Sequence, residues 1–211
     1  FYRFVCDLGF TTVNACYPMS EDCEDKKGAD HRAGKTLYGA ASTSPLVSFS
    51  NEEKALIFKA LYDTIPQFRG AIRIFSPRCT LHGLIKKFTA AQPALFPCRG
   101  GSDFFFADCK NGVISPCGYR DEPRDELPNL KQRAGLTTYC DLCEWECFRD
   151  PSDVLGPFAM LFSQPVHLLH KMVKDPRFFQ ILMNDLSYYR ACGYFNGRLA
   201  PQWQALKRFQ R

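Results

Sequence analysis

In the first part of the chain, the spacing of hydrophobic residues alternates between that of helices and that of strands. Four apolar residues at helical spacing open the sequence: Phe1, Phe4, Val5 and Leu8. Gly9 follows where a C-cap glycine is expected, so the chain is predicted to begin in the last turns of a helix. The β-branched and aromatic run at 11–18 then predicts a buried strand, which ends at Pro18.

The next helix is predicted after a long polar segment. Residues 19–48 are rich in Ser, Gly, Asp and Lys without a hydrophobic period, and we expect them to form a loop. Ser50 offers an N-cap with Glu53 at the capping-box position, and the apolar face that follows predicts a helix up to Pro66. A second strand is expected at 71–77. The shorter helix after it is marked by four apolar residues: Leu81, Leu84, Ile85 and Phe88.

The order of these elements predicts a mixed α/β fold. Two strands separated by a helix imply a parallel pair with a right-handed crossover. Chemistry in such folds lies at the carboxyl ends of the strands, which here are the segments 17–19 and 76–78. A glycine-rich phosphate loop, a G-x-S-x-G elbow and an H-E-x-x-H helix are all absent from the sequence. Nucleotide hydrolysis, serine chemistry and zincin chemistry therefore have no motif to support them.

A β-hairpin is predicted in the second half of the chain. Short strands are expected at 104–107 and 113–115, around a turn that ends in the strong turn signal Asn111-Gly112. Cys98 precedes the hairpin and Cys117 follows it, so the two thiolates are expected to meet. Cys140-x2-Cys143-x3-Cys147 comes next along the chain. Such close spacing is typical of a site that binds a metal through sulfur.

The last part of the chain is predicted to be helical. A helix is expected to start near 150–152, and two helices are expected at 155–173 and 175–192. The aromatic residues here are interpreted as core: Tyr188, Tyr189, Tyr194, Phe195, Trp203 and Phe209. His167 and His170 lie on one helix face without a suitably spaced carboxylate, so we interpret them as solvated rather than metal-binding.

The composition narrows the class of protein. The chain has 211 residues, of which 45% are hydrophobic and 23% are charged, so it can form a globular core and does not resemble a disordered chain. No apolar run approaches the roughly 18 residues that a membrane-spanning helix needs. The net charge of +5 is modest and spread along the chain, and it marks no clear nucleic-acid site.

Cysteine is the unusual component. The chain holds 11 cysteines, and most of them crowd into residues 98–147. Disulfides would suit a small secreted domain, whereas a parallel α/β half favours a cytoplasmic chain with reduced thiols. A structural zinc site needs only four cysteines and fits Cys98, Cys117, Cys140 and Cys143. Iron-sulfur ligation tolerates irregular spacing and accounts for the surplus cysteines, so it is the favoured interpretation.

This cysteine pattern resembles that of a known family. The spacing C-x13-G-x4-C, followed by C-x2-C, is similar to the SPASM-type auxiliary-cluster extension of radical S-adenosylmethionine enzymes. The residues that carry the resemblance are Cys98, Gly112, Cys117, Cys140 and Cys143, with Cys192 further downstream. The family carries this extension directly after a partial (β/α) barrel, and residues 1–90 are similar to the last two βα units of such a barrel.

The resemblance implies a domain plan and a chemistry. Residues 1–92 would form the C-terminal portion of a partial (β/α) barrel, 93–150 a SPASM-like iron-sulfur domain with a β-hairpin, and 151–211 a helical extension. In the family, a catalytic cluster reduces S-adenosylmethionine to a 5′-deoxyadenosyl radical, which abstracts a hydrogen atom from the substrate. The implied partners are a peptide or small-molecule substrate and an electron donor such as a flavodoxin or a ferredoxin.

The chain departs from the family pattern at two points. The family has C-x2-C-x5-C-x3-C in its second block, whereas this chain has C-x2-C-x3-C, so we expect one auxiliary 4Fe-4S cluster, or two at most. The C-x3-C-x2-C motif that binds the catalytic cluster does not occur in these 211 residues. We therefore expect a longer parent with that motif upstream, and we expect the incomplete parallel sheet to leave an open strand edge.

The resemblance also implies individual site residues. The expected metal ligands are Cys98, Cys109, Cys117, Cys140, Cys143, Cys147 and Cys192. Cys109 is an extra cysteine in the hairpin turn and is equally well explained as an ordinary turn thiol. Asn14 and Ser76 stand near strand ends, where the family places cofactor and substrate contacts. The alternative function, from another class, is a non-catalytic binding module stabilised by zinc.

Overall fold

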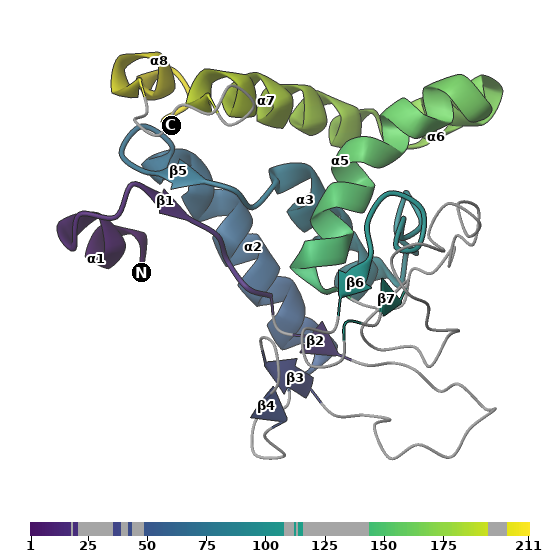
Figure 1. Cartoon of the computed structure of the whole chain (residues 1–211), viewed down its shortest axis with the longest axis horizontal. Coiled ribbons are helices and arrows are strands. Elements are labelled where there is room, and N and C mark those ends of the chain that lie inside the picture. The colour runs from purple at the N-terminus through teal and green to yellow at the C-terminus, as the bar shows by residue number, and fades with distance from the viewer. Residues whose placement is uncertain are drawn as a thin grey trace.

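Helices dominate the molecule (Figure 1). The computed structural model describes residues 1–17, 19–20, 36–38, 42–43, 49–107, 112, 114–115, 144–193 and 202–211. Within this part of the chain, short strands accompany the helices, so the predicted mixture of helix and strand is confirmed in its coarse form. The partial barrel and the SPASM-like domain stay predictions.

The predicted parallel strand pair is present. β1 (Thr12–Val13) pairs in parallel with β5 (Arg73–Ile74), with Thr12 opposite Arg73 and Val13 opposite Ile74. α2 (Asn51–Phe68) connects the two strands in the chain, as a parallel arrangement requires. Both strands are shorter than the segments predicted from the sequence.

The helix before β1 ends as its sequence predicts. α1 (Tyr2–Asp7) is followed by Gly9 with a φ angle of 81°, which a side chain would make costly. The Gly9 N–H donates to the Cys6 carbonyl at 2.9 Å, and the Phe10 N–H donates to the Val5 carbonyl at 3.1 Å. These two bonds form a Schellman motif, which turns the chain into β1.

α2 begins at the predicted capping box but extends beyond the C-terminal end predicted for it. Ser50 accepts a hydrogen bond from the Glu53 N–H, and the Glu53 carboxylate accepts one from the Ser50 N–H. The prediction that the helix ends at Pro66 is wrong, because α2 continues to Phe68. A proline cannot donate to the carbonyl four residues earlier. Here the Arg78 side chain donates to that Tyr62 carbonyl at 3.0 Å, so the helix continues without an unsatisfied acceptor.

The loop predicted at 19–48 contains strands where the structure describes it. β2 (Met19–Ser20), β3 (Thr36–Tyr38) and β4 (Ser42–Thr43) pair in antiparallel order. The loop prediction is therefore wrong at these positions, and the rest of the segment lies outside the described residues.

The predicted hairpin is confirmed in its described part. β6 (Phe106–Ala107) pairs antiparallel with β7 (Ile114–Ser115), with Phe106 opposite Ser115. Gly112 has a φ angle of 71°, the left-handed conformation for which glycine is suited. The other turn residues, 108–111, lie outside the described residues.

The C-terminal helices differ from the predicted boundaries. The helix expected from 150–152 starts earlier, as α5 (Glu146–Ser163), and includes two internal prolines. The single helix predicted at 155–173 is wrong, because the chain breaks at Gln164 and resumes as α6 (Pro165–Lys174). α7 (Pro176–Cys192) agrees with the prediction, and α8 (Trp203–Lys207) ends the chain.

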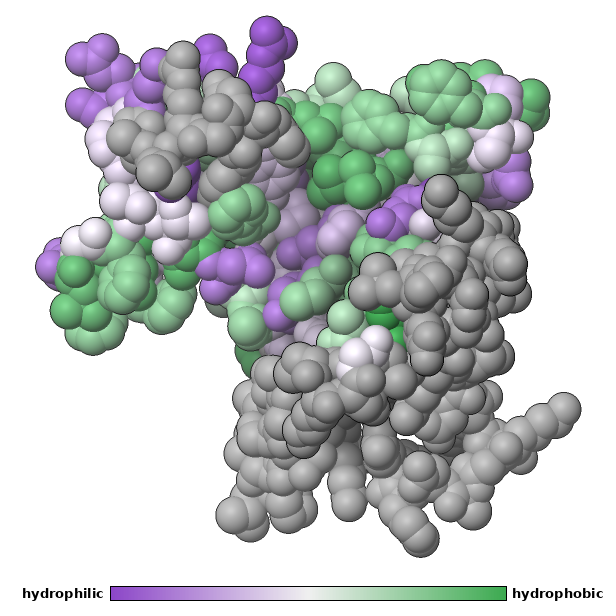
Figure 2. All heavy atoms as spheres, viewed as in Figure 1, coloured by the Kyte–Doolittle hydropathy of each residue, from purple (hydrophilic) through white to green (hydrophobic). Residues whose placement is uncertain are grey.

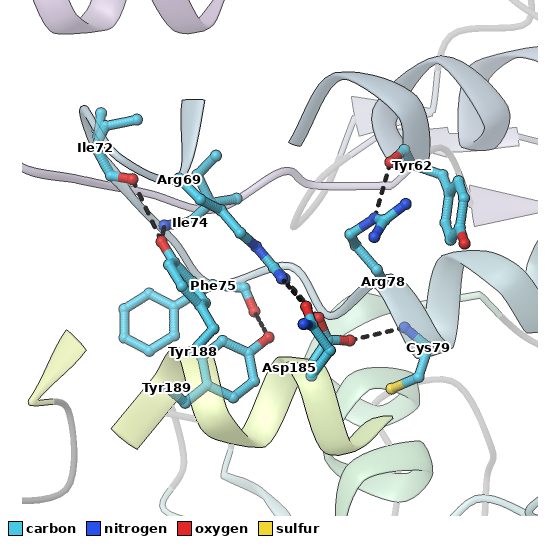
Figure 3. A network of polar contacts seen from close by, with 11 residues as sticks. Tyr62, Arg69, Ile72, Ile74, Phe75, Arg78, Cys79, Asp185, Tyr188 and Tyr189 are labelled. Carbon is cyan, nitrogen blue, oxygen red and sulfur yellow. Dashed lines mark hydrogen bonds and ion pairs between the residues drawn. The ribbon is translucent and has the colours of Figure 1, made fainter. Parts of the chain in front are cut away.

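Helix α7 covers the outer edge of β5 (Figure 3). The Ile74 N–H donates to the Tyr188 hydroxyl at 2.9 Å, and that hydroxyl donates to the Ile72 carbonyl at 3.3 Å. The Tyr188 hydroxyl thus makes the two hydrogen bonds that a neighbouring strand would otherwise make with β5. The prediction of an open strand edge is wrong on this side of the sheet, because α7 satisfies the backbone groups that would recruit another chain.

Three hydrophobic clusters hold the described residues together. The first lies among α1, β1, α2, β5 and α3 (Arg78–Ala90), and includes Tyr17, Phe58 and Ile74. The second joins α3, α6 and α7 to the segment around Phe96. The third packs the end of α7 against α8, through the predicted aromatic core residues Tyr188, Tyr189, Trp203 and Phe209. Tyr194 and Phe195 lie outside the described residues.

Apolar side chains also gather on one outer surface. Figure 2 shows hydrophobic residues over α6 and the neighbouring ends of α5 and α7. The exposed members on α5 and α6 are Leu155, Phe158, Leu161, Phe162, Val166, Leu169, Met172 and Val173. His167 and His170 are exposed on α6, as predicted. Among the described helices, none is long and apolar enough to cross a membrane.

Replacing Tyr188 by phenylalanine should destabilise the protein. The change removes the partner of the buried Ile74 N–H and Ile72 carbonyl, which should cost about 1–3 kcal/mol in the free energy of unfolding. Tyr189→Phe is the comparison, because the Tyr189 hydroxyl donates to a different backbone group, the Phe75 carbonyl, at 2.6 Å. Urea unfolding checks both, and equal losses in the two variants would refute the role given to Tyr188.

Replacing Asp175 by asparagine should remove a pH-dependent contribution to stability. Asp175 caps α7 by accepting from the Phe178 N–H at 3.1 Å, and it pairs with Lys86 at 2.7 Å. Burial raises the pKa of its carboxyl, but the bonds from Lys86 and Phe178 outweigh this and lower it below 3.8. Asparagine keeps the cap and loses the charge.

The stability difference between wild type and Asp175→Asn should be about 0.5–1 kcal/mol at neutral pH. Because the folded pKa is depressed, the difference should persist above pH 3.8 and disappear as the pH falls through the folded value. Asp63→Asn, which breaks an exposed pair with Lys59, is the matched control. A difference that stays constant down to the lowest pH at which the protein folds would contradict this account.

Candidate functional site

The segment that carries Cys98 is fixed on helices α5 and α6. Lys171 donates to the Leu95 carbonyl at 2.5 Å, and the Arg149 guanidinium donates to the Phe96 carbonyl. The Arg99 N–H donates to the Ser152 hydroxyl at 2.9 Å. Cys98 therefore lies on backbone that is bound on both sides.

Helix α5 has a glycine where this segment approaches it most closely. A Cβ atom at Gly156 would come within 3.0 Å of the Phe96 side chain. Phe96 is only 1% exposed and also contacts Phe178 and Phe179 of α7. The glycine thus lets the Phe96 ring, and with it the Cys98 segment, lie directly against α5.

The hairpin packs on the first turn of α5. The Phe104 ring contacts the Phe148 ring with 5.3 Å between centroids, and the Phe106 ring lies 6.2 Å from Trp145. Trp145 and Phe148 in turn contact each other at 5.0 Å. These rings hold the hairpin that follows Cys98 beside the helix turn that carries Cys147.

The residue after Cys143 is also fixed. Glu144 is fully buried and forms an ion pair with Lys87 of α3 at 2.5 Å. Cys143 itself lies outside the described residues, but its neighbour in the chain is thus tied to α3. The end of the C-x2-C-x3-C block therefore has a fixed attachment to the helical core.

The structure brings Asn14 and Ser76 together at the ends of β1 and β5. The Ser76 hydroxyl donates to the Asn14 side-chain oxygen at 2.9 Å and accepts from the Ala15 N–H at 3.0 Å. Ser76 is fully buried, whereas Asn14 is exposed. Ser76 thus holds the strand end in place, and Asn14 presents its amide at the surface.

The chain beyond Asn14 reaches the start of α5. The Tyr17 N–H donates to the Glu146 carboxylate at 3.4 Å, and the Tyr17 hydroxyl donates to the Asp150 carboxylate at 3.1 and 3.3 Å. Tyr17 is 1% exposed and its ring meets Phe58 edge-on. The end of β1 and the first turn of α5 are therefore joined by a buried tyrosine.

Two exposed cysteines lie at this junction. The Cys147 thiol donates to Glu146 Oε1 at 3.8 Å, and Cys16 directly precedes Tyr17, whose N–H donates to the same carboxylate. Both cysteines are unpaired and exposed. We call Cys16, Glu146 and Cys147 the α5 thiol site.

Burial and negative charge keep both thiols protonated. Burial raises the pKa of Cys16, and the Glu146 carboxylate raises it further. Burial likewise raises the pKa of Cys147, with added contributions from Glu146 and Cys16. Burial also raises the pKa of Asp150 well above its usual range. Without a cation, the α5 thiol site therefore favours neutral thiols over thiolates.

The predicted metal ligands that the structure describes lie in two separate parts of the molecule. Cys98 is partly exposed, on a segment bound to Ser152 in the second turn of α5, and Cys147 is exposed in the first turn. Cys192 is buried in the third cluster, where burial raises its pKa to about 11. That cluster is at the α8 end of α7 (Figure 1) and contains neither of the other two. Four predicted ligands lie outside the described residues: Cys109, Cys117, Cys140 and Cys143.

The donor chemistry of the described cysteines fits the expected cluster. Among the residues that the structure describes, no group of three or more His, Cys, Asp or Glu side chains is arranged to hold a single metal ion. Cys98 and Cys147 are free thiols accessible to solvent, on fixed segments that meet at α5. Soft thiolate donors of this kind suit iron-sulfur clusters and zinc alike.

Sequence reasoning missed Cys16 and Glu146. The rule that chemistry lies at the carboxyl ends of strands pointed to residues 17–19, next to Cys16, but nothing local indicated that this strand end meets α5. Glu146 stands directly before Cys147 in the chain, and that adjacency was the available signal.

No family model, curated protein or solved structure matches this chain.

The cysteines should separate into two classes by their reactivity with iodoacetamide. Cys16 and Cys147 are exposed and should react in the folded protein, more slowly than in a peptide because their pKa values are raised. Cys79 and Cys192 are buried and should react only after unfolding. Mass spectrometry of peptides checks each site. Rapid labelling of Cys192 in the folded protein would contradict its place in the core.

Proposed function

We propose that this chain is the iron-sulfur cluster-binding part of a radical S-adenosylmethionine enzyme, which modifies its substrate through hydrogen abstraction by a 5′-deoxyadenosyl radical. The observation that carries the proposal is the cysteine pattern C-x13-G-x4-C followed by C-x2-C-x3-C. The parallel strands followed by a hairpin have the order expected of a barrel end with a SPASM-like domain.

The packing at α5 supports the use of both cysteine blocks in one place. The segment of Cys98 is hydrogen-bonded to Ser152, and the hairpin rings pack on Trp145 and Phe148. Both ends of the pattern that the structure describes thus lie at the first two turns of α5. The proposed ligands are Cys98, Cys109, Cys117, Cys140, Cys143 and Cys147. Cys192 is kept as a proposed ligand only because the family pattern also has a cysteine far downstream.

A bound cluster would supply electron transfer or a coordination point next to the substrate. The protein's contribution is to hold the thiols and to shape the surroundings. Lys87 fixes Glu144 beside the C-x2-C-x3-C block, and Trp145 and Phe148 pack against the hairpin rings at the start of α5. Binding of the cluster would be coupled to folding of this half of the chain.

Asn14 is proposed to contact cofactor or substrate, and Ser76 to position it. Asn14 is exposed at the end of β1, while its side-chain oxygen is held by the buried Ser76 hydroxyl. This leaves the Asn14 amide nitrogen as the group that can reach a ligand. The radical chemistry itself needs a C-x3-C-x2-C motif and an electron donor such as a flavodoxin or a ferredoxin, and these 211 residues do not contain that motif.

Anaerobic reconstitution with iron and sulfide tests the proposal. The chain should take up iron with inorganic sulfide and develop the broad visible absorption of thiolate-bound clusters. Cys98→Ala and Cys147→Ala should each lower the iron content severalfold, because each removes a ligand. Cys6→Ala is the matched control, since Cys6 is a partly exposed cysteine on α1.

Two outcomes would reject the proposal. The first is unchanged iron content in both Cys98→Ala and Cys147→Ala. The second is tight binding of zinc with no uptake of iron and sulfide, which would favour a zinc-stabilised binding module.

A further inference from the structure

Cys16 lies outside the cysteine pattern, yet the structure places it with Cys147. The Cys147 thiol in the first turn of α5 donates to the Glu146 carboxylate, and so does the Tyr17 N–H, which directly follows Cys16 at the end of β1. The two cysteines come from distant parts of the chain, so their meeting is a result of the fold rather than of local sequence.

The backbone at Cys16 is held firmly on both sides. Ala15 donates its N–H to the buried Ser76 hydroxyl at 3.0 Å, and Tyr17 donates its N–H to Glu146 at 3.4 Å. The Tyr17 hydroxyl adds its bonds to Asp150. The position of Cys16 is therefore fixed by its neighbours and does not depend on its own packing.

The exposure of Cys16 argues against a purely structural thiol. Unreactive structural cysteines are usually buried, as Cys79 and Cys192 are here. Cys16 is exposed, although Tyr17 belongs to the first hydrophobic cluster and Ala15 packs against it. Its thiol instead lies at the surface beside a second thiol, an arrangement suited to binding a soft metal centre.

We infer that Cys16 is a further ligand of the proposed iron-sulfur site, beside Cys147. The inference rests on the proposed function. It supplies a thiolate from outside the C-x2-C-x3-C block, which has one cysteine fewer than the corresponding block of the family. Ligation forms one iron-sulfur bond, breaks the S–H bond of the thiol and releases its proton to solvent, to which Cys16 is exposed. No oxidation state changes in that step.

Footprinting with iodoacetamide tests the inference on the unmodified chain. The chain is labelled anaerobically before and after reconstitution with iron and sulfide, and the labelled peptides are measured by mass spectrometry. Reconstitution should slow the labelling of Cys16 and of Cys147 by tenfold or more. Cys6 is the control, because α1 lies far from α5 in Figure 1 and its labelling should not change.

Serine variants give an independent test. Cys16→Ser and Cys147→Ser should each bind less iron than wild type and give an altered visible and electron paramagnetic resonance spectrum, whereas Cys6→Ser should match wild type. Because Cys16 is exposed, the serine variant should fold, and circular dichroism checks this. If Cys16→Ser still fails to fold, the footprint of the unmodified chain decides the question.

The outcomes separate the inference from the function on which it rests. Protection of Cys147 alone, with wild-type iron content in Cys16→Ser, would overturn the inference and leave the proposed function standing. A chain that binds no iron and sulfide at all would overturn both. Protection of both cysteines, with loss of iron in both serine variants, is the result we expect.

Discussion

Asp185 on α7 joins three elements that the chain places far apart. Its carboxylate accepts from Arg69 at 2.5 Å, just beyond the end of α2, and from the Cys79 N–H at 2.9 Å in the first turn of α3 (Figure 3). Pro77 stands at the N-cap of α3 and gives it no side-chain cap, so Asp185 supplies one from another helix. A carboxylate at a helix N-terminus also interacts favourably with the helix dipole.

The rest of the fold follows from this attachment. A buried ion pair alone is weak evidence of stability, but here Arg69 also stacks on the Tyr188 ring at 4.2 Å. Asp185, Tyr188 and Tyr189 together hold α7 along β5. Once β5 is fixed, β1 pairs with it, and the end of β1 is directed toward α5. The junction of Tyr17 with Glu146, and so the meeting of Cys16 with Cys147, depends on that chain of contacts.

Local signals were readable from the sequence. The cap at Gly9, the capping box of Ser50 and Glu53, and the turn at Gly112 each depend on neighbouring residues, and the structure confirms them. Pro66 was misread as a helix end because the group that replaces its missing hydrogen bond, the Arg78 side chain, comes from another helix. The early start of α5 was missed because a proline suits the first turn of a helix, whereas Pro151 lies inside α5.

The candidate site was readable only in part. Asn14 and Ser76 were identified because the ends of adjacent parallel strands must meet, and the two residues are hydrogen-bonded. The cysteine pattern pointed to Cys98 and Cys147, whose segments contact the same helix. Cys16 and Glu146 could not be found in this way, since their contact requires the position of α5 relative to β1, which hydrophobic spacing does not specify.

The most direct test of the account is the metal and sulfide content of the chain purified without oxygen and never exposed to added metal. Elemental analysis, an assay for acid-labile sulfide and a Mössbauer spectrum of protein grown with ⁵⁷Fe should together identify the group that the cysteines hold. The account predicts iron and sulfide in matching amounts, with the Mössbauer signature of a cluster bound by cysteine. Zinc in place of iron, with no labile sulfide, would contradict it.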